Sequence, residues 1–194
     1  MPLPPGFHSV DRTPLGWRDM MFVVSAEHEH FMAQALSVAQ EGLDQGEMPI
    51  GAIVVVDGEI IASQHTQERA ARRLLVHADL LALEVADRTI GKDRDRATLY
   101  VNLEPCLMCL GAVFTARVGA VVYGLESPTD GGVAAFREWD KARLAEGMPG
   151  YLLPKISGGV LRAESARLFG EYADLANEGS WVSKWARDLS ILAE

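Results

Sequence analysis

The feature that most constrains the fold of this chain is an apolar hairpin near its start, followed by helices and strands in alternation. Residues 50–56 are a β-branched apolar run, Asp57-Gly58 is a strong two-residue turn, and residues 59–63 return as the partner strand. Three later segments are predicted strands: 98–103, 120–124 and 156–161. A hairpin that leads into alternating helices and strands predicts an α/β protein with a central mixed five-stranded sheet between two helical layers, a three-layer α/β/α domain.

Helical patterns occupy most of the remaining chain. They cover about Ser25 to Gly46, 77–88, 105–117, 162–177 and 180–192, with a short helical piece inside 127–150. Pro105 suits the first position of its helix, and residues 65–73 are predicted to form a polar loop. We expect three parts: an N-terminal extension (1–24), the main domain (25–178) and a C-terminal helix (179–194) that can cap a site.

The charge of the chain bears on its partners. The formal net charge is −9, and the basic residues are interleaved with acids, as in 91–96, which is typical of a solvated loop. Nucleic-acid affinity depends on Lys and Arg that neutralise phosphates. We therefore expect a small neutral substrate rather than a nucleic acid, although net charge leaves open a local basic groove.

The hydrophobic pattern bears on location. No apolar run approaches the roughly 20 residues that span a bilayer, so no membrane partner is expected. The N-terminal residues also lack the basic start and apolar stretch of a signal peptide. A cytoplasmic, reducing location is the resulting expectation.

The two cysteines of the chain are the first sign of chemistry. Cys106 and Cys109 stand three apart on a predicted helix, so both sulfurs can reach one point beside the helix N-terminus. The positive end of the helix favours thiolates, which zinc binds. The pair alone is equally typical of a thioredoxin-like redox site, and two inert buried thiols are a third alternative.

His77 favours the zinc alternative. It opens one predicted helix while the cysteine pair opens the next, and both helix starts are expected at the same edge of the sheet. His77, Cys106 and Cys109 would leave a fourth tetrahedral position for water, as catalytic zinc sites do. Zinc lowers the pKa of water towards 7, and Asp79 is placed to take the proton and pass it to a leaving amine. One zinc ion per chain is therefore predicted.

These residues resemble the zinc-dependent cytidine and deoxycytidylate deaminase superfamily, whose signature is H-x-E…P-C-x-x-C. Residues 48–55, 77–83 and 98–109 resemble its bacterial branch, which includes guanine deaminase, cytosine deaminase and tRNA adenosine deaminase. The resemblance covers about residues 25–175. It implies a cytidine-deaminase-like fold and a hydrolase that acts on a C–N bond of a cyclic amidine and releases ammonia.

Asp79 departs from the family pattern, which has Glu at this place. Asp is one methylene shorter, so its carboxylate lies about 1.5 Å further from the reacting water. A displacement of that order can lower the rate about a hundredfold. A working proton shuttle, a deliberate Glu→Asp change and a loss of activity are three explanations, of which we favour the first.

The resemblance also implies candidate substrate contacts. Thr66 aligns with a family Asn that contacts the base or ribose, and Glu104 stands beside the metal motif. Further contacts are expected from Ile50 and Ala78, and Trp181 or Trp185 is a candidate to stack on a base from the C-terminal helix. Each has a plain structural alternative, such as a loop hydroxyl, a surface charge or a helix that docks on the core.

Together these features predict a zinc-dependent hydrolytic deaminase of a free nucleobase, nucleoside or related heterocycle such as guanine, cytosine or a triazine. A role in purine or pyrimidine salvage and a homodimeric assembly are expected with it. The alternatives are a tRNA-specific adenosine deaminase, which the charge disfavours, and a Cys-x-x-Cys thiol redox protein.

Overall fold

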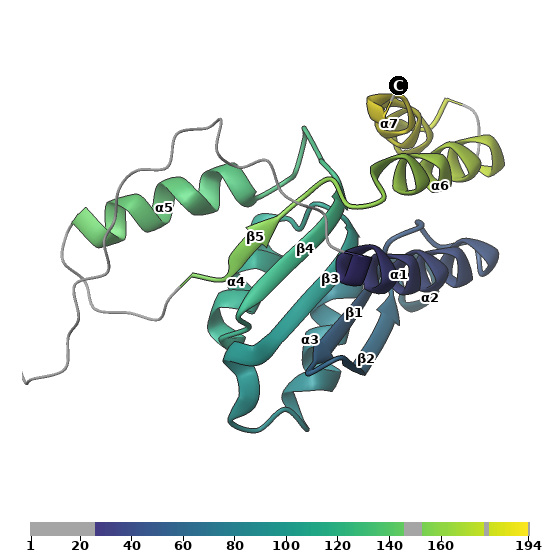
Figure 1. Cartoon of the computed structure of the whole chain (residues 1–194). Coiled ribbons are helices and arrows are strands. Elements are labelled where there is room, and N and C mark those ends of the chain that lie inside the picture. The colour runs from purple at the N-terminus through teal and green to yellow at the C-terminus, as the bar shows by residue number, and fades with distance from the viewer. Residues whose placement is uncertain (1–25, 146–152, 177–178, 194) are drawn as a thin grey trace, which may run out of the picture.

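A computed structural model of the chain describes residues 26–145, 153–176 and 179–193 (Figure 1). The proposed N-terminal extension and Ser25 lie outside these ranges. The elements, in chain order, are α1 (Ala26–Asp44), β1 (Gly51–Val56), β2 (Glu59–His65), α2 (Glu68–Ala71), α3 (Ala78–Asp87), η1 (Asp93–Arg96), β3 (Ala97–Leu103), α4 (Leu107–Ala116), β4 (Ala120–Leu125), α5 (Val133–Ala145), β5 (Lys155–Ser157), α6 (Arg162–Leu175), α7 (Trp181–Ser190) and η2 (Ile191–Ala193).

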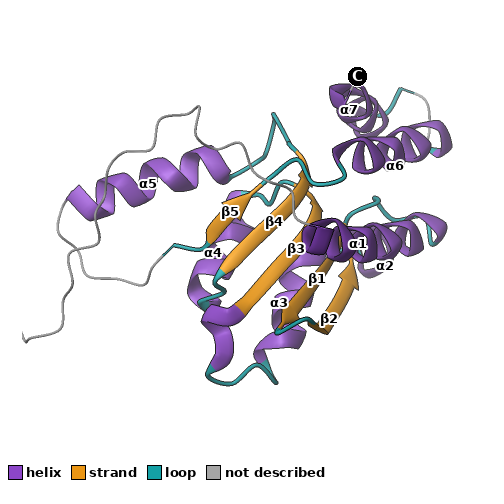
Figure 2. Ribbon diagram, viewed as in Figure 1, coloured by secondary structure: helices purple, strands orange, loops and turns teal. Residues whose placement is uncertain are grey.

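The five strands form one mixed sheet in the order β2-β1-β3-β4-β5. The β1 strand pairs antiparallel with β2 and β3, whereas β3, β4 and β5 are parallel. The hairpin turn is as expected, because Asp57 and Gly58 both have positive φ values (53° and 83°). The mixed five-stranded α/β fold predicted from the sequence is therefore confirmed (Figure 2).

Helices cover both faces of the sheet, as three layers require. Along β1, Ala52 and Val54 face a core cluster with α3 and α4, while Ile53 and Val55 face a second cluster with α1. This alternation follows from the two-residue period of a strand. The α6 helix lies on the α1 side, where it contacts α1, β3 and β4. Both faces of the sheet are buried, which explains why its central strands are largely apolar.

The α7 helix packs on α6 and shares its core. Ala186 and Leu189 of α7 are buried with Phe169 of α6 and Leu103 of β3. Ser180 caps the helix by accepting a hydrogen bond from the backbone N–H of Ser183. The division of the chain at residue 178 stays a prediction, but the helix beyond it contributes to the core.

Three local expectations need correction. Pro105 does not open α4: Cys106 is its N-cap and remains extended because it pairs with Gly131 in a β-bridge. The fifth strand is shorter than expected, since the backbone turns at Gly159 and Leu161, both with positive φ. The segment 65–73 is not purely a loop, because it contains α2.

None of the helices in the described ranges combines the length and apolarity that crossing a membrane requires.

Candidate active site

The predicted metal ligands meet at the edge of the sheet where α3 and α4 begin. His77 is the N-cap of α3, Cys106 is the N-cap of α4, and Cys109 lies in the first turn of α4. The β3 and β4 strands are parallel, so helices that follow or precede them on one side present their N-termini at the same edge. A side chain at the start of each helix is therefore brought to a common point.

The distances among the three ligand atoms fit a zinc ion. The two Sγ atoms are 3.5 Å apart, and His77 Nδ1 lies 3.8 Å from Cys106 Sγ and 3.5 Å from Cys109 Sγ. Tetrahedral zinc with ordinary bond lengths separates two sulfurs by about 3.8 Å, and a nitrogen from a sulfur by about 3.6 Å. The two cysteines do not form a disulfide, which would need about 2.05 Å between the sulfurs. The donor set thus has the size and chemistry of a three-ligand zinc site.

The pKa values of His77, Cys106 and Cys109 are all shifted by the contacts among these three side chains. Hydrogen bonds from Cys109 and His77 lower the pKa of the Cys106 thiol to about 4. The hydrogen bond with Cys106 raises the pKa of His77 to about 9, and the pKa of Cys109 is also raised because it donates to Cys106. These shifts favour a thiolate at Cys106 beside protonated neighbours, whose protons a metal cation can replace.

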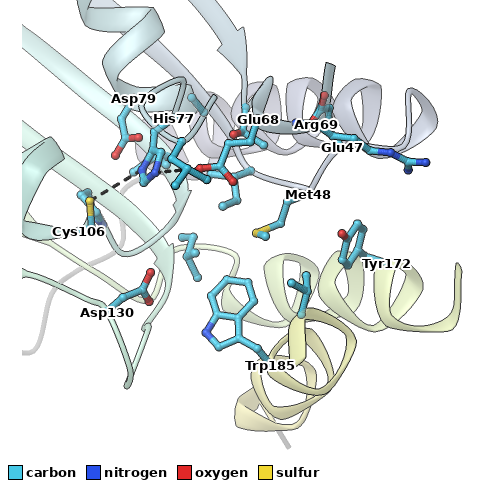
Figure 3. Close-up of a pocket in the computed structure, with 18 of the residues that line it drawn as sticks. Glu47, Met48, Glu68, Arg69, His77, Asp79, Cys106, Asp130, Tyr172 and Trp185 are labelled. Carbon is cyan, nitrogen blue, oxygen red and sulfur yellow. Dashed lines mark hydrogen bonds and ion pairs between the residues drawn. The ribbon is translucent and has the colours of Figure 1, made fainter. Parts of the chain in front are cut away.

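Asp79 lies beside this cluster. It is the second residue of α3, only 4% exposed, and lines the same cavity as His77 and Cys106 (Figure 3). Burial raises the pKa of its carboxyl, while a hydrogen bond with the Cys109 thiol acts in the opposite direction. Despite its shorter side chain, Asp79 reaches the donor atoms of the cluster.

The cavity beside the cluster has a volume of about 970 Å³. Every candidate substrate contact predicted from the sequence lines it, namely Ile50, Thr66, Ala78, Glu104, Trp181 and Trp185. In Figure 3, His77, Asp79 and Cys106 lie on one side of the cavity, and Tyr172 of α6 and Trp185 of α7 lie on the other. The volume exceeds that of a single heterocyclic base, so the cavity has room for further parts of a substrate.

Thr66 and Ile50 form the wall contributed by the hairpin. The Thr66 hydroxyl is buried and donates to the backbone carbonyl of Val76, 3.2 Å away, so its proton is used inside the protein. Ile50 is placed by Asn102, whose side chain accepts from the N–H of Gly51 (2.8 Å) and donates to the carbonyl of Pro49 (2.9 Å). Gly51 permits this arrangement, because a Cβ there would lie 2.3 Å from the backbone of α1.

Glu104 organises a loop of the cavity. Its carboxylate accepts backbone hydrogen bonds from Ser127 (3.1 Å) and Val133 (3.0 Å). These bonds span the loop that carries Thr129 and Asp130, both of which line the cavity. The acidic group expected beside the metal motif therefore has its carboxylate engaged in shaping the wall.

The two tryptophans of α7 differ. Trp185 packs edge to face on Phe169, with ring centroids 5.7 Å apart, and its Nε1–H donates to the Thr129 hydroxyl at 2.8 Å. Trp181 is 75% exposed and lies at the rim. Trp185 thus joins α7 to the opposite wall of the cavity.

Sequence reasoning did not identify several lining residues. They include Glu47, Glu68, Thr129, Asp130 and Tyr172. Each comes from a loop, a short helix or a distant helix without a recognisable motif. Of these residues, only Glu68 could have been suspected, because it is an acidic residue in the polar segment before His77. The sequence of that segment does not show in which direction its side chains point.

Comparison with known proteins agrees with this geometry. The model of the MafB19-like deaminase family matches residues 26–163. The chain is 42% identical over 106 residues to the tRNA-specific adenosine deaminase of Bacillus subtilis, which covers 54% of this chain and 66% of that protein. It is 32% identical over 148 residues to the enzyme of the same name from Agrobacterium fabrum, covering 76% of this chain and 94% of that protein. The chain thus spans just under two thirds of the Bacillus relative and most of the Agrobacterium one.

Solved structures show the same fold. One, from a study of A-to-I editing by tRNA:A34 deaminases, has a TM-score of 0.60 at 33% identity and covers 72% of this chain and 98% of that chain. Guanine deaminase from Nitrosomonas europaea has a TM-score of 0.61 at 22% identity, over 76% of this chain and 84% of that chain.

Fold and donor set together define the class: this is a member of the cytidine deaminase-like superfamily, whose deaminases are hydrolases acting on C–N bonds. Within it, the chain belongs to the MafB19-like deaminase family, since that match extends over more than half of its length. The resemblance inferred from the sequence motifs is confirmed.

Proposed function

We propose that the protein is a zinc-dependent hydrolytic deaminase of an amino-substituted heterocyclic base, and that adenosine in a tRNA is the first substrate to test. The observation that carries the proposal is the approach of His77 Nδ1 to both Sγ atoms at 3.5–3.8 Å beside a large cavity. His77, Cys106 and Cys109 would hold the ion. When bound, zinc would supply an acidified water for attack on the amine-bearing ring carbon.

The residues around the ion divide the remaining work. Asp79, buried at the same end of the cavity, would accept a proton and deliver it to the leaving amine. Ile50 and Ala78 supply apolar walls for a flat ring, and Trp185 limits access of water from the α7 side. Thr66 has an oxygen free to accept a hydrogen bond from the substrate, because its proton is given to Val76.

The tRNA substrate rests on the relatives. The sequence argued against a nucleic-acid partner because of the charge of −9, but both curated relatives described above are tRNA-specific adenosine deaminases. That expectation conflicts with the comparisons. Net charge fixes neither the local charge of a surface nor its contacts with phosphates, so it was a weak basis for excluding tRNA.

A free base or nucleoside is a second candidate, and the charge of the cavity favours it. Among the described residues, five with carboxylates line the cavity, against one arginine, Arg69; the acidic residues are Glu47, Glu68, Asp79, Glu104 and Asp130. A phosphate inside the cavity would meet a negative potential, whereas a ring with amino groups can donate to carboxylate oxygens. In tRNA deamination the phosphates would therefore have to stay outside.

The test is metal analysis followed by a substrate panel. We expect one zinc per chain by plasma mass spectrometry, and ammonia release from either a tRNA transcript or a member of a base and nucleoside panel. Inosine in digested tRNA would identify the first substrate. Cys106→Ser is the matched inactive control.

Two results would contradict the proposal. If wild type and Asp79→Glu both release no ammonia from any substrate, the deaminase function is wrong. A metal-free protein with a reversible Cys106–Cys109 disulfide would support the redox alternative instead. The homodimer, the cytoplasmic location and a role in base salvage stay predictions.

A further inference from the structure

Glu68 contacts the side of His77 that faces away from the cysteines. Its Oε1 lies 3.2 Å from His77 Nε2, on the side of the ring away from Cys106 (Figure 3). His77 Nδ1 instead points to the sulfurs of Cys106 and Cys109. The imidazole is therefore held between two different partners. Neither the sequence motifs nor the proposed chemistry gives Glu68 a role.

The backbone next to Glu68 is hydrogen-bonded to the side chain of Glu47. The Glu47 side chain is only 3% exposed, and its carboxylate accepts from the N–H groups of Arg69 (2.9 Å) and Ala70 (2.7 Å). These N–H groups belong to the first turn of α2, which has no hydrogen bond from its own N-cap side chain. Glu47 thus fixes the short helix on which Glu68 is the first residue.

A second set of contacts fixes α2 relative to His77. The N–H of Gln67 donates to the carbonyl of Val76 at 3.1 Å, and the Thr66 hydroxyl donates to the same carbonyl. The two residues just before α2 are therefore joined to Val76, the residue just before His77. These hydrogen bonds fix the position of α2, so the contact between the Glu68 carboxylate and His77 Nε2 is supported by the surrounding structure.

The chemical consequence concerns the tautomer of His77. An ionised carboxylate only accepts hydrogen bonds, so it favours the proton on Nε2 and leaves the lone pair on Nδ1. Only that tautomer can bind a metal between Nδ1 and the sulfurs. As an ion pair the contact would contribute little, since the His77 and Glu68 side chains are 31% and 29% exposed. Its value lies in orientation.

We propose that Glu68 is a positioning residue of the metal centre: by accepting the Nε2–H of His77, it fixes the tautomer and rotation that turn Nδ1 towards Cys106 and Cys109. The inference rests on the proposed function, because it requires the three ligands to bind zinc. Partners of this kind typically contribute 10–100-fold to metal affinity.

The test compares zinc affinity, measured by chelator competition, in wild type, Glu68→Ala, Glu68→Gln and the control Glu84→Ala. Glu84 is an exposed helical glutamate paired with Arg88. We expect Glu68→Ala to weaken zinc binding about 10–100-fold. Glu68→Gln keeps an acceptor oxygen and should stay within about threefold of wild type. The control should match wild type, and melting curves should confirm that each variant is folded.

A purely fold-stabilising role of Glu68 predicts a different result. If Glu68 only stabilised the fold, zinc affinity would follow melting temperature, and glutamine would not restore it selectively. Long-range ¹H–¹⁵N spectra of the zinc-loaded protein should show His77 protonated at Nε2, with slower exchange of that proton in wild type than in Glu68→Ala.

The outcomes separate the two proposals. Wild type that binds no zinc overturns the proposed function. Wild type that binds zinc, together with Glu68→Ala within threefold of it, overturns the role of Glu68. Equal weakening by Ala and Gln overturns the hydrogen-bonding explanation, because glutamine retains the acceptor.

Discussion

Replacement of Asp79 by asparagine should stop proton transfer while leaving the metal site intact. The two side chains have nearly the same shape, so the change suits a position that is only 4% exposed and packed beside Cys109. An amide cannot accept the proton from water. General acid–base catalysis contributes about 10²–10⁴ in rate, which corresponds to about 2.7–5.4 kcal/mol of activation free energy.

The assay is steady-state ammonia release on the substrate identified by the panel, with zinc content measured in parallel. We expect kcat to fall by at least a hundredfold, KM to change little and zinc to remain at one per chain. Asp87→Asn is the matched control, because Asp87 ends the same helix with an exposed side chain paired to Arg94. If Asp79→Asn kept kcat within threefold of wild type, Asp79 would not be the proton shuttle.

Three further predictions concern the ligands and walls of the cavity. Cys109→Ser should reduce zinc in chelator-washed protein from one ion to below about 0.1 per chain by mass spectrometry, since a neutral hydroxyl is a poor zinc ligand; retention of a full ion would remove Cys109 from the ligand set. Trp185→Phe keeps the ring against Phe169 but loses the hydrogen bond to Thr129, so KM should rise about two- to tenfold at nearly constant kcat; an unchanged KM would argue against a capping role. Gly131→Ala should lower the free energy of unfolding by about 1–3 kcal/mol in urea titration, because its Cβ would lie 2.5 Å from the Glu104 carboxylate. Gly111→Ala is the control and should be neutral or stabilising, because apart from its chain neighbours and the backbone of its own helix no atom lies within 4 Å of the new Cβ.

The position of α7 changes how a capping role can be tested. Removing the residues after Glu178 would be the direct experiment if the helix only covered the site. Ala186 and Leu189 are however buried against α6, so truncation would also expose the core. Point changes at Trp185 avoid that loss of stability and separate binding from folding.

The meeting of His77, Cys106 and Cys109 could be predicted from the sequence because it depends on local geometry. Cys106 and Cys109 are three apart at the start of a helix, and His77 opens another, so helix periodicity and the parallel β3–β4 pair bring them together. The short apolar runs separated by helical patterns likewise predicted a sheet between two helical layers.

Side-chain contacts between residues that are distant in the sequence could not be predicted from these local patterns. The sequence offered Glu68 as part of a polar segment and Glu104 as an acid beside the motif, with no indication of their partners. The contacts of Glu68 with His77 and of Glu104 with Ser127 and Val133 depend on how separate loops close over the sheet edge. Such contacts have no period along the chain, because side-chain direction in loops is set by tertiary packing.

The sequence by itself therefore determined the fold class and the convergence of His77, Cys106 and Cys109, since both follow largely from local repeats of two or 3.6 residues. Only the tertiary structure decided which carboxylate contacts His77, how Asp79 reaches the cluster despite its shorter side chain, and that Trp185 donates a hydrogen bond to Thr129. These contacts satisfy the hydrogen-bonding groups of segments that are distant in the sequence, so they form only in the folded chain.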